Sequence, residues 1–190
     1  LRSFDMEAQH ELAFRTLQGG LNLGKVVVRI AVRQSGRHGD HAVTGGTGGL
    51  GLLTGRWLAQ NGAGQLWLAS RSGALGRHTS AEWEAVQASG ASATLAVCDA
   101  GEATQVTRLA AVARSLSGVW HAAGVLADAT LPQQEAAGLA RVHAPKAHGA
   151  WSLQAVCTTT VTGAFALFSP VAELLGGAGR ANHAAANACL

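Results

Sequence analysis

Residues 41–51 read His41-Ala42-Val43-Thr44-Gly45-Gly46-Thr47-Gly48-Gly49-Leu50-Gly51, and this stretch decides the fold. Its short apolar start predicts a β-strand, and its glycines predict a tight loop. A helical pattern follows over residues 49–61. Strand, glycine loop and helix in this order are typical of the start of a βαβ unit.

The glycines of this loop have separate expected roles. Gly45 allows a tight turn with positive φ. Gly48 lets the backbone approach a pyrophosphate without a Cβ in the way, and Gly51 lets the helix pack closely on the strand. The helix N-terminus offers unpaired N–H groups and a positive dipole end to phosphates. The pattern therefore predicts a dinucleotide site, with a plain glycine-rich turn as the alternative.

Short apolar runs recur after this loop at intervals of about 25 residues, with helical patterns between them. The expected strands are 41–44, 65–69, 93–97, 118–121 and 164–169, and the expected helices are 49–61, 80–89, 102–115, 132–142, 146–156 and 179–190. The runs are nearly all apolar rather than alternating, as in strands buried on both faces. We therefore expect an α/β fold, a Rossmann-like, doubly wound and mostly parallel sheet.

The first 40 residues differ from this alternation. They predict a helix, then a β-branched strand over 25–30 and a polar linker over 35–40. We therefore divide the chain into residues 1–40, the end of a preceding domain with its linker, and residues 41–190, the dinucleotide-binding domain. The chain begins at Leu1 and stops at Leu190 inside an alanine-rich helical pattern, so we expect a fragment that is incomplete at its C-terminal end.

The composition excludes several classes of protein. With 48% hydrophobic and 13% charged residues among 190, the chain is globular rather than disordered. Its net charge of +3 comes with scattered arginines, which argues against nucleic-acid binding. No apolar run reaches the roughly 18 residues of a membrane span, and no signal peptide is present.

The cysteines and histidines point to an intracellular protein without a metal site. Cys98, Cys157 and Cys189 form no close pair, which favours a reducing compartment, cytoplasmic or plastid. The pairs His38/His41 and His143/His148 have no cysteines or carboxylates at ligand spacing, so we expect no metal.

Polar and small residues end the later strands, where ligands of parallel sheets bind. Ser70 and Arg71 end the second strand beside the expected adenosine ribose; an arginine there favours a 2′-phosphate, and so NADPH over NADH, unless it simply faces solvent. Asp99 ends the third strand and could accept a hydrogen bond from adenine. The fourth strand is followed by small residues that leave room for a nicotinamide ribose: Ala122, Ala123 and Gly124.

These segments resemble the short-chain dehydrogenase/reductase superfamily and, more narrowly, the ketoreductase domain of modular polyketide synthases. The matching segments are 44–51, 68–73, 98–99, 121–126, 145–151 and 167–187. Residues 13–15 and 24–28 are similar to the tail of an enoylreductase domain. The resemblance implies NADPH-dependent reduction of a β-ketoacyl thioester on an acyl carrier protein, beside neighbouring synthase domains. It implies these cofactor-binding residues: Thr44, Gly45, Thr47, Gly48, Gly51, Ser70, Arg71, Asp99, Ala122, Ala123 and Gly124.

The resemblance also implies four catalytic positions, and two of them are changed here. Lys146 matches the family's lysine and Asn187 its asparagine. The tyrosine position, four residues before Asn187, holds His183, and the chain has no tyrosine. The serine position, thirteen residues before His183, holds Pro170. Asp128 falls where acidic residues linked to stereochemistry occur in this family.

The two replacements predict severely impaired ketoreduction. Pro170 has no hydroxyl or N–H to donate, and Ser169 would point to the opposite face if this segment is a strand. His183 could donate a proton as imidazolium, but the Lys146 ammonium disfavours a second positive charge. Losing the acid typically costs about 10²–10⁴-fold and losing an oxyanion donor about 10²–10³-fold. The alternatives are a non-catalytic NADPH-binding or scaffold module of the synthase, and a stand-alone reductase that uses His183.

Overall fold

The computed structural model describes residues 2–19, 26–29, 39–113, 115–170 and 177–190, and the chain forms two units, Leu1–Gly36 and Arg37–Leu190. In the first unit, strands β1 (Arg2–Asp5) and β2 (Val26–Arg29) pair in parallel, and helix α1 (Met6–Gln18) packs against both. The sequence predicts α1 and β2 but not β1. Lys25, Ile30 and residues 35–38 of the expected linker lie outside the described residues.

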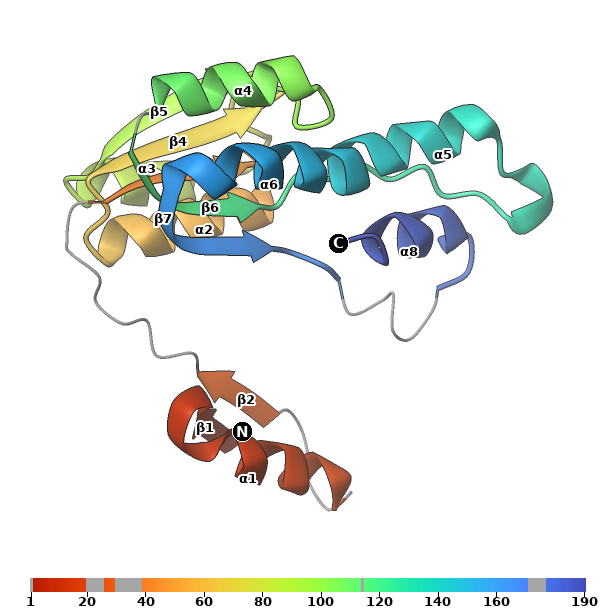
Figure 1. The fold of residues 1–190 in the computed structure, drawn as a ribbon, viewed down its shortest axis with the longest axis horizontal. Helices are drawn as coiled ribbons and strands as arrows, with labels where there is room; N and C mark the ends of the chain where they lie inside the picture. Colours follow the sequence, from red (N-terminus) through yellow and green to blue (C-terminus); the bar gives the residue numbers. More distant parts are fainter. Residues whose placement is uncertain (1, 20–25, 30–38, 114, 171–176) are drawn as a thin grey trace. The chain divides into compact units, whose positions relative to one another are not determined.

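The second unit is built on one sheet of five parallel strands in the order β5-β4-β3-β6-β7 (Figure 1). The strands are β3 (Asp40–Thr44), β4 (Gln65–Ser70), β5 (Ser92–Val97), β6 (Leu116–His121) and β7 (Val161–Leu167). The helices are α2 (Gly49–Gln60), α3 (Ser80–Ala88), α4 (Ala103–Val112), α5 (Ala136–His143), α6 (Gly149–Thr160) and α8 (Ala181–Asn187). The second unit thus has the α/β, Rossmann-like architecture expected from the sequence.

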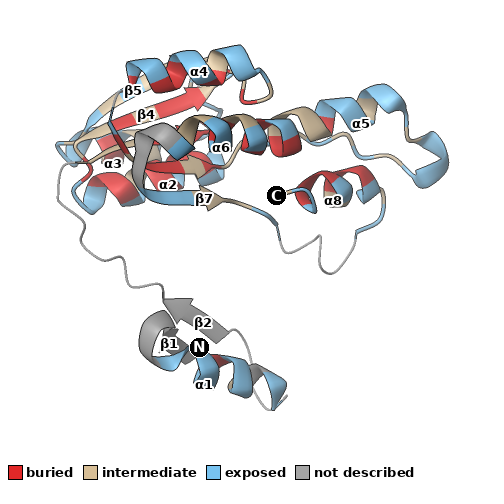
Figure 2. Cartoon of the chain, viewed as in Figure 1, coloured by how far each residue is buried: buried red, intermediate tan, exposed pale blue. Residues whose placement is uncertain are grey.

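Apolar side chains on the two faces of the sheet form two separate cores. Successive strand residues point to opposite faces, so Ala42 and Val43 of the central strand belong to different clusters. Ala42 lies in the cluster with Val106 of α4 and Leu153 of α6. The other cluster joins Val43 to residues of α2, β4 and α3: Leu52, Leu58, Leu66, Leu68 and Val86. Figure 2 shows these buried positions in red on β4 and on one side of α2 and α4.

Helix α2 begins directly after the glycine loop. Gly48, its N-cap, has extended backbone angles (φ −92°, ψ 174°), so the chain turns into the helix at that residue. The helix ends at Gln60; the N–H of its C-cap, Asn61, donates to Trp57 O, and Gly62 follows with φ +89°. A left-handed residue just past the end is the usual way for a helix to stop. The loop and the start of α2 therefore lie at the carboxyl end of β3.

The region around Pro145 differs from its sequence prediction. We expected two separate helices, 132–142 and 146–156. The structure has a 3₁₀ turn over Leu131–Gln133, then α5, a π-helical turn over Ala144–His148 and α6 without interruption. A proline lacks an N–H and cannot donate within a regular α-helix, and a π turn accommodates that lost hydrogen bond. Lys146 therefore comes from inside a helical path rather than from a helix start.

The other boundaries differ by a few residues. β7 covers Val161–Leu167, whereas the sequence predicted a strand over 164–169, so Ser169 follows the strand instead of belonging to it. Within the described ranges, no helix is long and apolar enough to cross a membrane. The same residues contain no group of three or more His, Cys, Asp or Glu side chains that could hold a metal ion.

Candidate cofactor and substrate pockets

The glycine loop is held close to the ends of β4 and β6. Gly45 has φ +71°, and a Cβ built there would lie 2.8 Å from the carbonyl carbon of Ala122. Gly46 N–H donates to Ala69 O at 3.0 Å, and Gly48 N–H donates to Gly45 O at 3.0 Å. Both the positive φ and the close approach require glycine at position 45. The tight turn expected from the sequence is therefore present.

Gly48 and Gly51 lie in different surroundings. A Cβ at Gly48 would have Gly45 O at 3.4 Å as its nearest neighbour, so the space beyond this residue is open. A Cβ at Gly51 would collide with Gly45 O and lie 2.9 Å from Gly46 Cα. Gly51 thus allows the helix to pack on the loop itself. Helix α2 also contacts β3, and the expected role of Gly51 in packing the helix on the strand stays a prediction.

A large pocket of about 610 Å³ opens beside this loop, at the carboxyl ends of β3, β4, β5 and β6. It is lined by Gly45, Thr47, Gly48, Gly49, Leu50, Gly51, Ser70, Arg71, Ser72, Cys98, Asp99, Ala100, Ala122, Ala123, Gly124, Val125 and Pro145. Ten of the eleven residues predicted to bind the cofactor are in this lining. The strand ends that the sequence singled out separately therefore converge on one cavity.

Thr44 is the exception, since it does not line the pocket. Its side chain is buried, and its hydroxyl lies 2.6 Å from His121 Nδ1. Thr44 closes β3 and His121 closes β6, where the two residues are register partners. The pair therefore ties the two central strands together beneath the pocket, instead of offering a hydroxyl to a ligand.

His121 is a buried histidine in its neutral form. Burial lowers the pKa of His121 to about 4, and the positive charge of Lys146 acts in the same direction. The backbone at Pro145 and Lys146 partly opposes this shift in the pKa of His121. Among the described residues no partner lies within hydrogen-bonding geometry of its Nε2 atom. A neutral imidazole avoids placing a second buried cation near Lys146.

The polar residues of the large pocket differ in how firmly they are held. Asp99 is half-buried, and its Oδ1 accepts a hydrogen bond from Gly101 N–H at 2.9 Å. Ser70 Oγ accepts from Gly73 N–H at 3.1 Å. Arg71 is exposed, and it forms no ion pair with any residue that the structure describes. Its guanidinium is therefore available to a ligand in the pocket.

A smaller pocket of about 310 Å³ adjoins the large one. It is lined by Leu50, Ala122, Gly124, Val125, Leu126, Lys146, Phe168, Ser169, Pro170 and His183. Leu50, Ala122, Gly124 and Val125 line both cavities, so the two pockets are contiguous. Three of the four predicted catalytic positions, Lys146, Pro170 and His183, meet in this smaller cavity.

Lys146 is buried at the wall of the smaller pocket. Only 5% of the residue is exposed, and its Nζ donates to Phe168 O at 2.8 Å. A Cβ at Gly124 would lie 3.0 Å from Lys146 Cε, so glycine leaves the space that the lysine chain needs. The π turn and the chain after β7 thus fix the ammonium beside the pocket.

Ser169 and Pro170 both line the smaller pocket. The expected alternation of side chains between two faces does not apply, because β7 ends at Leu167. The expectation for Ser169 applied only if this segment were a strand, and that condition is not met. Ser169 is therefore a lining residue, one residue before the position where the family has its serine.

His183 and Asn187 lie one turn apart on α8 in different roles. His183 lines the pocket and is 9% exposed. Asn187 is buried and lines neither pocket; its Nδ2 donates to His183 O at 2.8 Å and lies 3.4 Å from His183 Nδ1. Asn187 therefore supports His183 from behind and does not face the cavity. The sequence placed both residues on one helix face, and that spacing alone could not distinguish these two positions.

Comparison with known proteins agrees with this arrangement. Residues 39–190, most of the chain, match the family model described as the KR domain. The chain belongs to the KR domain family. This KR domain is 38% identical over 195 residues to the spectinabilin polyketide synthase system protein NorB of Streptomyces orinoci, covering 100% of the chain and 9% of that protein. It is 41% identical over 155 residues to polyketide synthase GfsB of Streptomyces halstedii, covering 80% of the chain and 3% of the relative.

Solved ketoreductases have the same fold. A structure titled as an A1-type ketoreductase is 35% identical with a TM-score of 0.75, over 85% of this KR domain and 36% of that chain. The ketoreductase from the first phoslactomycin module of Streptomyces sp. HK803 is 34% identical with a TM-score of 0.72, over 81% and 36%. The KR domain described here thus spans a small part of the synthases and about a third of these structures.

The site also contains residues that the sequence did not single out. Ser72 lines the large pocket two positions after Ser70, where β4 ends. Its place just after the end of a strand is the only sequence signal that could have indicated this. Asn182 is buried beside His183 and contacts Ala127 O. A polar residue directly before His183 in a short helix carries no distinct sequence signal, because the same pattern is common on exposed helix surfaces.

Proposed function

We propose that this chain is an NADPH-binding KR domain of a modular polyketide synthase in which β-ketoacyl reduction is impaired. One observation carries the proposal: a cofactor-sized pocket opens into a smaller one that holds Lys146, yet Pro170 and His183 stand where the family has a serine and a tyrosine. The binding half of the site is thus intact, and the proton-donating half is altered.

The large pocket fits a dinucleotide. Family membership supports a nicotinamide cofactor, which supplies hydride when bound. The first-turn N–H groups of an α-helix have no partners within the helix, and the first residues of α2, Gly49, Leu50 and Gly51, line this pocket. Arg71 would bind the 2′-phosphate, and this favours NADPH. Asp99 would accept a hydrogen bond from adenine, with its other oxygen held by Gly101.

The smaller pocket would receive the ketone. The Lys146 side chain lies at its wall and would stabilise the negative charge that develops on the ketone oxygen during reduction. Pro170 has no donor for that oxygen. The imidazole of His183 is shorter than the phenol that the family has at this position. These two changes reduce the rate, by about 10²-fold or more for either alone.

Residual reduction by the chain's own groups is a second candidate, favoured by a specific observation. Ser169 lines the same pocket as His183, so a hydroxyl and an imidazole remain there. In this reading Ser169 binds the ketone oxygen and His183 gives the proton. A carrier-bound acyl chain is the substrate in both readings, and a non-catalytic module would still hold NADPH beside its neighbouring synthase domains.

The proposal is tested by comparing binding with turnover. We expect the chain to bind NADPH and to oxidise it slowly or not at all with a β-ketoacyl thioester. The Pro170→Ser/His183→Tyr double variant is expected to be at least about 100-fold faster, because it restores both donors. Residues 39–190 would also replace the matching segment of the A1-type ketoreductase, to measure the rate in a complete catalytic frame.

Each outcome separates the candidates. Absence of NADPH binding would contradict the proposal. Turnover by the unmodified chain that disappears in Ser169→Ala would support residual reduction instead. Equal activity of the chain and the double variant would show that Pro170 and His183 do not limit the rate.

A further inference from the structure

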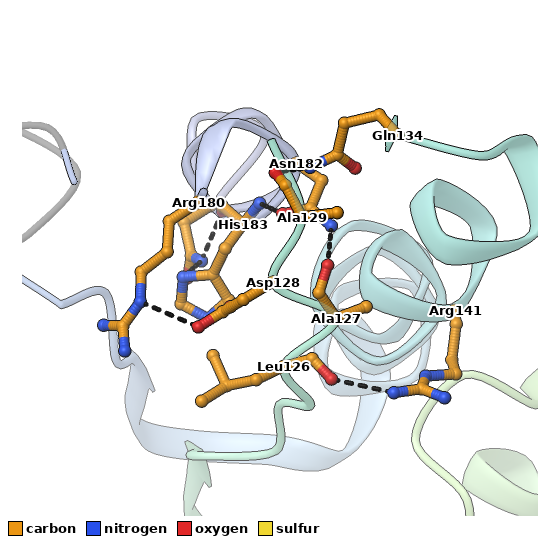
Figure 3. Close-up of polar contacts among 10 residues, drawn as sticks. Leu126, Ala127, Asp128, Ala129, Gln134, Arg141, Arg180, Asn182 and His183 are labelled. Carbon is orange, nitrogen blue, oxygen red and sulfur yellow. Dashed lines mark hydrogen bonds and ion pairs between the residues drawn. The ribbon is translucent and has the colours of Figure 1, made fainter. Parts of the chain in front are cut away.

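Asn182 is a buried amide that uses both ends of its side chain. It is 2% exposed and lies in the first turn of α8, directly before His183. Its Nδ2 donates to Ala127 O at 2.6 Å, and its Oδ1 accepts from His183 N–H at 2.7 Å (Figure 3). One side chain therefore joins the helix that carries His183 to the segment that follows β6.

That segment forms part of the pocket walls. Val125 and Leu126 line the smaller pocket, and Ala127 comes next in the chain. Arg141 of α5 donates to Leu126 O at 2.8 Å, which holds the segment from its other side (Figure 3). A shift of Ala127 relative to α8 would therefore move one wall of the pocket against His183.

Other contacts join α8 to the same segment at the surface. Ala129 N–H donates to Gly179 O at 2.9 Å. Arg180 forms an ion pair with Asp128 at 3.2 Å, with side chains 45% and 43% exposed. Exposed ion pairs of this kind contribute little, whereas a buried amide must keep its partners. Asn182 is thus the buried member of this set.

We propose that Asn182 is a positioning residue that fixes His183 at the wall of the smaller pocket by joining α8 to the segment after β6. The family resemblance assigns no role to this position. The inference rests on the proposed function only in naming the smaller pocket as the ketone site. Its test needs neither cofactor nor substrate, so its failure and that of the proposed function are distinguishable.

An isosteric variant separates the two hydrogen bonds. Asn182→Asp keeps an acceptor for His183 N–H, but its carboxylate cannot donate to Ala127 O and faces that carbonyl instead. Asn182→Ala removes both hydrogen bonds. Arg180→Ala is the matched control, because it removes the exposed tie to the same segment at the same helix end.

The readouts are the imidazole NMR signal of His183, identified by its loss in His183→Gln, and the rate at which diethylpyrocarbonate modifies this residue. In both Asn182 variants we expect a shifted His183 signal and modification about tenfold faster. The buried hydrogen bonds of Asn182 hold the backbone that carries the His183 ring, and each variant loses at least one of them. Arg180→Ala is expected to match the unmodified chain. Lower thermal stability with an unchanged His183 signal and rate would overturn the proposal.

A second measurement needs no variant. The N–H of a residue at the third helical position normally lacks a partner. His183 has Asn182 Oδ1, whereas Glu82 holds the same position in α3, whose N-cap makes no side-chain hydrogen bond. We expect the His183 amide to exchange with deuterium about tenfold more slowly than the Glu82 amide, each relative to its intrinsic rate. Equal or faster exchange at His183 would overturn the proposal.

Discussion

Arg71 is exposed at the edge of the large pocket, and its role can be tested by cofactor choice. We expect Arg71→Ala to weaken NADPH binding by about 10- to 100-fold, because a hydrogen bond to a charged group is worth about 1.5–3 kcal/mol. NADH lacks the 2′-phosphate, so its binding should change far less. Fluorescence titration with both cofactors measures this. Arg77→Ala, an exposed arginine outside the pocket lining, is the control, and equal losses for both cofactors would exclude the 2′-phosphate role.

His121 makes stability depend on pH. Burial and Lys146 lower the pKa of His121 to about 4, whereas an unfolded histidine titrates near 6.5. Between these pH values the unfolded chain binds a proton at His121 that the native chain does not. The contribution of His121 to the free energy of unfolding is therefore fully present above pH ~6.5 and is lost as pH falls toward ~4. The loss amounts to about 3 kcal/mol.

Urea unfolding at neutral and at mildly acidic pH tests this dependence. We expect His121→Asn to be less sensitive to acid than the unmodified chain, because asparagine does not titrate. His78→Asn is a matched control at an exposed histidine, whose φ of +62° asparagine tolerates. An unchanged acid dependence in His121→Asn would show that another group is responsible.

The residue-scale expectations differ in how well the sequence supports them. Arg71 and Asp99 were predictable, because parallel strands bring their ends to one edge of a sheet. The positions of Thr44 and Asn187 were not predictable. The Thr44 hydroxyl contacts His121, which is distant in sequence. The Asn187 side chain contacts the backbone of His183 and does not line the pocket. Ser169 depended on where β7 ends, and a strand boundary is set by pairing with β6 rather than by local pattern.

Substituting two glycines of the same loop is expected to have different effects, one on stability and the other on NADPH binding. Gly45→Ala should lower the free energy of unfolding by about 1–3 kcal/mol, because residue 45 has φ +71° and a Cβ would press on Ala122. Gly48→Ala should leave stability nearly unchanged, since its Cβ has 3.4 Å to its nearest neighbour, while NADPH binding falls because the Cβ enters the pocket.

Urea unfolding and NADPH titration of both variants separate the two effects. Gly138→Ala in α5 is the control, because a Cβ there meets nothing within 4 Å and the residue lines neither pocket. If Gly48→Ala binds NADPH as well as the unmodified chain does, the loop does not approach the cofactor at that residue.

At the element scale, Pro145 shows the limit of periodic patterns. The helices on both sides of it were predictable from apolar spacing, but they were expected to be two separate helices. The structure continues through a π turn, and this turn is what directs Lys146 to the pocket wall. The local sequence shows that residue 145 has no N–H to donate. It does not show that Gly101 packs on Ala144, a long-range contact that helps to hold the turn.

At the scale of the whole molecule, the alternation of strands and helices predicted the sheet of the second unit. β1 escaped prediction because a strand of four residues depends on its pairing with β2. Both pockets are lined entirely by residues of the second unit, Arg37–Leu190. None of the described residues before His41 lines either pocket. That residues 1–40 are the end of an enoylreductase-like domain and its linker stays a prediction.

The strand order also governs how the chain can fold as it is synthesised. Every pairing in this sheet is parallel, so no strand can pair through a local hairpin, and long-range pairing of this kind folds slowly. β3 emerges first and pairs with β4, but its second neighbour, β6, begins 72 residues after Thr44. Until then one edge of the central strand has no native partner, and exposed strand edges promote association between chains. The same order that brings the ligand-facing strand ends together therefore leaves the nascent chain open to aggregation until Leu116–His121 has been made.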